Sequence, residues 1–128
     1  MQGNVNREIT LLASAARTVE ADSPLQGNFS AKGITIVVDI TVDPATAVIT
    51  PNILMRDPVS GKDIIIWTAA AALGAVGTTV YQLYPGAIAA DFDGTEAASI
   101  ILPHKWTFRM TVGNASSMTY SVGASYHK

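Results

Sequence analysis

Apolar and polar residues alternate with a period of two along much of the chain. In residues 34–42 every even position is isoleucine or valine, while Thr35, Asp39 and Thr41 occupy odd positions. The same alternation recurs in residues 105–112 and 117–126. Successive side chains of a β-strand point to opposite faces of its sheet, so this period predicts strands with one buried face.

Turn-forming residues separate the apolar runs. Residues 47–55 and 63–68 are rich in β-forming residues, and the segment between them contains Asp57, Pro58 and Gly61. An Asp-Pro pair favours a turn, and glycine accepts the positive φ that such turns need. This pattern predicts a hairpin, and residues 113–116 predict a second one between 105–112 and 117–126.

Weaker signals complete the predicted architecture. Strands are also expected at residues 8–12, 16–20, 78–84 and 99–102. Residues 69–76 and 87–98 are expected to be loops, and no stretch has the pattern of an amphipathic helix. About eight or nine short strands predict an all-β fold, most simply an antiparallel β-sandwich, with a closed barrel as the alternative. We expect one domain over residues 8–128, preceded by a polar arm over residues 1–7.

Composition points to a surface that is partly covered by partners. The chain has 128 residues, of which 48% are hydrophobic and only 14% are charged. Soluble domains usually carry about 25% charged residues. The net charge of −2, with scattered basic residues, argues against nucleic acid or an anionic membrane as a partner. The longest apolar run, residues 64–80, contains two glycines and is too short to span a bilayer.

Candidate catalytic chemistry is sparse, and we expect no enzyme activity and no cofactor. The chain contains no cysteine and two histidines, His104 and His127, neither at a spacing that suggests a relay with Ser and a carboxylate. Asp91 and Asp93 resemble the start of a calcium loop, but Leu102 stands where the bidentate glutamate belongs. An acidic turn is the simpler interpretation, with cation binding by the two aspartates left open.

The aromatic residues raise the possibility of a carbohydrate-binding module. A platform for stacking sugars would need aromatic rings on the surface, but Trp106, Phe108 and Tyr120 fall on the apolar sides of alternating strands. We therefore expect these three rings to be core, and keep the carbohydrate-binding β-sandwich as an alternative of a different class.

Several segments together carry a resemblance to a known group of proteins. These segments are residues 33–41, 56–62, 83–86, 102–106 and 119–125. In combination they resemble small structural proteins encoded among the head genes of tailed bacteriophages, over residues 8–126. The resemblance implies a capsid decoration (cement) protein, made in the host bacterial cytoplasm, that binds the outer surface of the virion head. It further implies the major capsid protein and a homotrimer of the chain itself as partners. A phage tail-tube or connector subunit is the alternative structural role.

The expected contacts with a capsid follow from the low charge. We predict apolar and backbone contacts made by the N-terminal arm and by one end of the sandwich. The candidate partner-contact residues are Met1, Gln2, Gly3, Asn4, Val5, Asn6 and Arg7.

Overall fold

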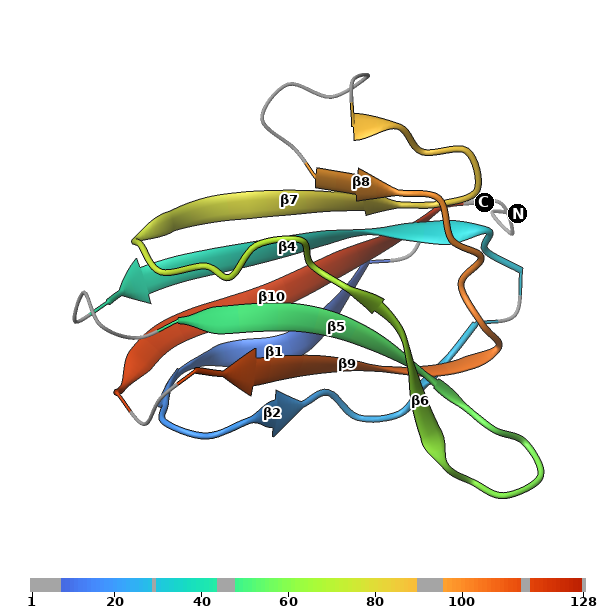
Figure 1. Ribbon diagram of the computed structural model, residues 1–128, viewed down its shortest axis with the longest axis horizontal. Coiled ribbons are helices and arrows are strands. Elements are labelled where there is room, and N and C mark those ends of the chain that lie inside the picture. The colour runs from blue at the N-terminus through green and yellow to red at the C-terminus, as the bar shows by residue number, and fades with distance from the viewer. Residues whose placement is uncertain (1–7, 29, 44–47, 90–95, 114–115, 128) are drawn as a thin grey trace.

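Two β-sheets pack face to face over a single core (Figure 1). The computed structural model describes residues 8–28, 30–43, 48–89, 96–113 and 116–127. The arrangement confirms the predicted β-sandwich, and the sheets do not close into a barrel.

The first sheet contains the longest strands. Its order is β1 (Glu8–Arg17), β10 (Met118–His127), β4 (Gly33–Val42), β7 (Gly77–Leu83) and β8 (Glu96–Ala98). All neighbours in it are antiparallel except β7 and β8, which are parallel.

The second sheet is built around two strands of eight residues each. Its order is β2 (Ala21–Asp22), β9 (Lys105–Val112), β5 (Ile49–Arg56) and β6 (Asp63–Thr68), and β3 (Gln26–Gly27) pairs with β9 near its start. All of its pairs are antiparallel. Strand β6 therefore forms one edge of the sheet and the short strands β2 and β3 form the other.

The core lies where the alternating strands face each other. Strand β4 buries Ile34, Ile36, Val38 and Ile40, as its period predicts. Val42 departs from that prediction and is exposed, because it is the last residue of the strand. From β9 and β10 the core receives Trp106, Phe108, Met110, Met118, Tyr120 and Val122.

The predicted hairpin between residues 47–55 and 63–68 is confirmed. Strands β5 and β6 are antiparallel neighbours, and the Asp57 N–H donates to the Lys62 carbonyl at 2.8 Å. Gly61 has a φ of +75°, a conformation that residues with a side chain rarely adopt. Its N–H donates to the Asp57 carbonyl at 2.9 Å, which closes the turn.

The predicted second hairpin is wrong. Strand β9 pairs with β5, β2 and β3, whereas β10 pairs with β1 and β4 in the other sheet. The chain after Val112 therefore crosses from one layer to the other. Both strands have an apolar face, and in a sandwich those faces meet across the core as readily as they would lie side by side.

Two strand boundaries also differ from the predictions. Residues 8–12 and 16–20 were expected as separate strands, but β1 is continuous over Glu8–Arg17 and absorbs the irregular pattern through shifts in its register with β10. The strand expected at 99–102 is also wrong. The paired residues there are Glu96–Ala98, and Leu102 is buried from a loop in which its N–H donates to the Lys32 carbonyl at 3.2 Å. Residues 69–76 form the predicted loop.

Candidate interaction surface

The two histidines have local structural partners. The His104 Nδ1 donates to the Asn28 carbonyl at 2.7 Å. The Thr35 hydroxyl donates to Gln82 Oε1 at 2.6 Å and contacts the His127 ring nitrogen Nε2. Among the described residues no group of three or more His, Cys, Asp or Glu side chains is placed to hold a metal ion. Asp91 and Asp93 lie outside the described residues, so the possible cation site there stays a prediction.

The aromatic side chains that are described are buried except Tyr84, which is half-buried and packs edge-on against the His127 ring, with 6.0 Å between the ring centroids. Trp106, Phe108 and Tyr120 are buried, which confirms that they are core residues. The Trp106 Nε1 donates to the Tyr126 hydroxyl at 3.2 Å, and that hydroxyl donates to a carbonyl at 3.4 Å. In the part of the chain that the structure covers, none of the exposed large apolar side chains is aromatic. These residues therefore provide no platform on which a sugar would stack.

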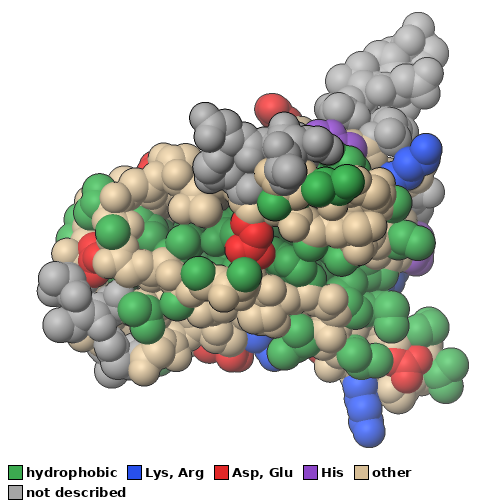
Figure 2. All heavy atoms as spheres, turned by 45° about the horizontal axis from the view of Figure 1, so that its top comes forward, with side chains coloured by type: hydrophobic (Ala, Val, Ile, Leu, Met, Phe, Trp, Pro, Cys, Tyr) green, Lys and Arg blue, Asp and Glu red, His purple; other side chains and the backbone are tan. Residues whose placement is uncertain are grey.

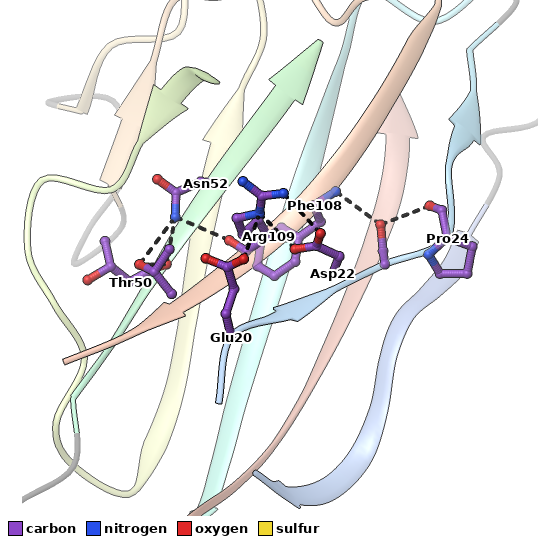
Figure 3. A network of polar contacts seen from close by, with 9 residues as sticks. Glu20, Asp22, Pro24, Thr50, Asn52, Phe108 and Arg109 are labelled. Atoms are coloured by element: carbon purple, nitrogen blue, oxygen red, sulfur yellow. Dashed lines mark hydrogen bonds and ion pairs between the residues drawn. The ribbon is translucent and has the colours of Figure 1, made fainter. Parts of the chain in front are cut away.

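A charged cluster on the outer face of the second sheet fixes strand β2 (Figure 3). The Arg109 guanidinium donates to both carboxylate oxygens of Asp22, at 2.8 and 3.0 Å, and Glu20 lies 3.4 Å away. The hydrogen bonds to Asp22 raise the pKa of Arg109. Planar two-point contact of this kind holds geometry well. The cluster therefore attaches a two-residue strand to β9.

Next to this cluster, Asn52 joins three strands of the same sheet (Figure 3). Its amide group donates to the Thr50 carbonyl at 2.9 Å and the Arg109 carbonyl at 3.2 Å. Its Oδ1 accepts a hydrogen bond from the Thr68 hydroxyl at 2.7 Å. Because these polar atoms are satisfied within the sheet, a structural role accounts for this buried side chain.

A shallow hollow of about 390 Å³ lies on the outer face of the first sheet. Its wall includes Glu8, Thr10, Thr35 and Ser125, and Gly123 contributes no side chain between them. The lining contains a single charged side chain and no aromatic ring, so it has little with which to orient a ligand.

Exposed valines gather at one end of the sandwich, which we call the loop end. Strands β1, β4 and β9 finish there and β5, β7 and β10 begin there (Figure 1). Its exposed apolar side chains are Val19, Val42, Val48 and Val76. The segment before Val76, residues 69–75, contains five alanines and no charged residue. The Gly113 N–H donates to the Val48 carbonyl at 2.9 Å, which joins two of the connections at this end.

The second exposed apolar feature is the β5–β6 hairpin, which projects from the body of the molecule (Figures 1 and 2). Val59 at its tip is 93% exposed, and Ile64 and Ile65 on β6 are 46% and 53% exposed. The tip is held by the Asp57 carboxylate, which accepts hydrogen bonds from the Ser60 hydroxyl at 2.6 Å and the Val59 N–H at 3.0 Å. These hydrogen bonds lower the pKa of Asp57. We call residues 63–66 of β6 the hairpin edge.

Neither surface was assigned to residues from the sequence. The predicted contact residues of the arm, Met1 to Arg7, lie outside the described residues. The prediction that one end of the sandwich makes contacts named no residues, and the loop end now supplies candidates. The available signal for the hairpin edge was the run of three isoleucines at 64–66, which cannot all face one core from a strand.

No family model and no curated protein matches this chain. Within the described residues, none of the segments forms a helix of the length and apolar character needed to cross a membrane.

Proposed function

We propose that the chain is a non-enzymatic structural protein of a bacteriophage head, which decorates the outer surface of the capsid by binding the major capsid protein. The observation that carries this proposal is the loop end, where four exposed valines lie at the same end of the sandwich as an uncharged, alanine-rich segment. A protein that braces a shell needs a rigid body and an apolar contact area, and it needs no catalytic pocket.

The energetics of such a contact favour burial over charge. Full burial of a valine side chain contributes roughly 1.5–3 kcal/mol, so a few valines supply a useful share of a binding free energy. The net charge of −2 provides little long-range attraction. We therefore expect affinity for the capsid to change little with ionic strength.

The alternatives differ in where the protein would be found. A tail-tube or connector subunit would also suit an open strand edge such as that of β6, whereas the burial of Trp106, Phe108 and Tyr120 weighs against a carbohydrate-binding module. Immunoelectron microscopy of virions from the phage that encodes the chain separates these roles. Label over the head supports decoration, label along the tail supports a tube or connector, and unlabelled virions overturn all the virion roles.

The loop end is tested by placing a charge in it. We expect Val76→Asp, at a side chain that is 62% exposed, to weaken binding to heads prepared without the protein by at least about tenfold, because the contact would bury an unpaired carboxylate. Ile101→Asp is the matched control, since Ile101 is 75% exposed and precedes β9 at the opposite end. Equal binding of both variants, or binding that collapses at moderate salt, would contradict an apolar contact at the loop end.

The predicted role of the arm requires its own variant. Deletion of residues 1–7 leaves every described strand intact, so we expect the shortened protein to fold and to bind heads less tightly if the arm contacts the capsid. Unchanged binding would remove Met1 to Arg7 from the contact and leave it to the sandwich.

A further inference from the structure

Strand β6 is the open edge of the second sheet. It pairs with β5 on one side, and no described strand pairs with its other side. Its exposed side chains include two isoleucines, whereas proteins commonly protect such edges with charged residues or proline. The charged group within the edge, Asp63, is already paired with Arg56 at 2.7 Å. The edge therefore offers another chain unpaired backbone groups flanked by apolar side chains, without an unpaired charge inside the strand.

The register with β5 determines which backbone groups face outward. The Asp57 N–H donates to the Lys62 carbonyl, so these two residues form a hydrogen-bonded pair. Hydrogen-bonded and non-hydrogen-bonded pairs alternate along an antiparallel ladder. Asp63 lies opposite Arg56, and Ile65 lies opposite Leu54; both pairs are therefore non-hydrogen-bonded. The backbone N–H and C=O groups of Asp63 and Ile65 thus point away from β5, to the open side of the sheet.

We propose that a second copy of this chain binds there, through antiparallel pairing of the two β6 strands about a two-fold axis. Asp63 of each copy lies opposite Ile65 of the other, and the two Ile64 residues face each other on the axis. In this register, the outward-facing N–H and C=O groups of Asp63 and Ile65 in each strand form hydrogen bonds with those of the other strand. A shift that centres the axis on Asp63 would place two like charges directly opposite, which destabilises a strand pair. A shift the other way would run into the register irregularity after Ile65.

Charge complementarity favours the same orientation. Antiparallel pairing directs Lys62 of one copy toward the far end of β6 in the second copy. Beyond that end, the Ala70 N–H donates to both oxygens of the Glu96 carboxylate, at 3.0 and 3.1 Å. In this register Lys62 of each copy lies opposite Ile66 of the other, on the side of the strand that leads to this acidic group and away from the other Lys62. Parallel pairing would instead bring the two Lys62 residues together.

This pairing would make the chain a dimer, in place of the homotrimer that the resemblance to phage head proteins implies. The contact is isologous, so it closes on itself and does not generate a filament. A single strand pair buries less than the roughly 1,200 Å² typical of stable complexes, so we expect a dimer that dissociates on dilution. The inference does not depend on the capsid role, because the loop end and the hairpin edge are separate surfaces.

Cross-linking tests the register directly, because the chain has no cysteine of its own. The two Ile64 residues would form a non-hydrogen-bonded pair with Cα atoms about 4.5 Å apart, a separation that a disulfide spans. We expect Ile64→Cys to form a disulfide-linked dimer at least about tenfold faster than Val59→Cys at the hairpin tip. Equal rates for the two variants would overturn the register.

Light scattering and sedimentation then test the dimer in solution. We expect the unchanged protein to pass from dimer to monomer on dilution, and Ile65→Lys to be monomeric throughout. Ile65→Pro should also be monomeric, because it removes an outward-facing N–H and leaves the hydrogen bonds to β5 in place. Val59→Lys is the control for added charge, and circular dichroism confirms that each variant is folded. A monomer at all concentrations, or a trimer that persists in Ile65→Lys, overturns the proposal, whereas Val76→Asp should leave the dimer unchanged.

Discussion

Strands β4 and β6 are both rich in isoleucine, but the isoleucines of β4 are buried in the core, whereas those of β6 are partly exposed at the edge of a sheet. Strand β4 lies between β10 and β7, and its strict alternation sends Ile36 and its even-numbered neighbours into the interior. Strand β6 pairs with β5 alone, and its three isoleucines follow one another directly. An alternating pattern matches one buried face, whereas a continuous apolar run on an edge strand leaves side chains exposed.

Strand β6 is anchored to the core near its end, by Trp67 and by the partly buried Ile66. Trp67 is buried and packs edge-on against Tyr81 of β7, with 5.3 Å between the ring centroids. The register shift opposite Ile53 and Leu54 brings Trp67 to the inner face, although Ile65 lies on the outer one. The edge of β6 is therefore fixed to the core at one end and accessible over the rest.

The largest loss of stability is expected from the centre of the second sheet. Strand β9 occupies the same central position there as β4 does in the first sheet, and Trp106 is fully buried. We expect Trp106→Ala to lower the free energy of unfolding by about 3–5 kcal/mol, through lost burial and the cavity left behind. Urea denaturation followed by circular dichroism measures this loss. A value below about 1 kcal/mol would contradict the placement of Trp106 in the core.

The contrast between β4 and β6 is tested by one substitution made at two positions. Ile36→Ala should lower the free energy of unfolding by about 2–5 kcal/mol, because that side chain has no exposed surface. Ile65→Ala should cost less than about 1 kcal/mol under conditions where the protein is monomeric. Similar losses at the two positions would mean that the hairpin edge is covered within the monomer.

Much of the fold follows from local pattern, and the errors have physical causes. Alternation identified β4, β9 and β10, and the Asp57-Pro58 turn with Gly61 identified the β5–β6 hairpin. Strands β2 and β3 have two residues each, which is too short to show a period, and the Arg109–Asp22 ion pair that holds β2 is not visible as a pattern. The register shifts in β1 broke its alternation and made one strand look like two.

The proposed contact surfaces were harder to predict because they depend on topology. Whether a strand is central or at an edge is decided by which partners it finds, and the wrong β9–β10 hairpin shows how little a short connection reveals about this. The valines of the loop end come from segments far apart in the sequence, such as Val19 and Val76, and only the folded chain brings their segments to one end. The sequence therefore predicted apolar contacts at Met1 to Arg7 and at an unspecified end of the sandwich, but not the exposed side chains of the loop end or the hairpin edge.

A further effect is expected at alkaline pH and concerns Tyr81, the residue of β7 against which Trp67 packs. Burial, with a further contribution from the Glu96 carboxylate, raises the pKa of Tyr81 from 10.0 to about 12. The folded protein thus retains this proton where the unfolded chain has lost it. Stability from the neutral hydroxyl is complete below the unfolded pKa of 10.0 and is lost as the pH rises toward about 12. We expect a total loss of about 1–3 kcal/mol.

Tyr81→Phe provides the matched comparison, since it keeps the ring that packs against Trp67 and removes the titrating group. Denaturant unfolding at a series of alkaline pH values should show a steeper loss of stability for the unchanged protein than for Tyr81→Phe, and ultraviolet absorbance reports tyrosinate formation. Other groups that titrate in this range affect both proteins equally, so the difference between the two curves isolates Tyr81. Parallel curves would mean that the Tyr81 hydroxyl reaches solvent, and Tyr81 would then be less tightly buried than its contact with Trp67 implies.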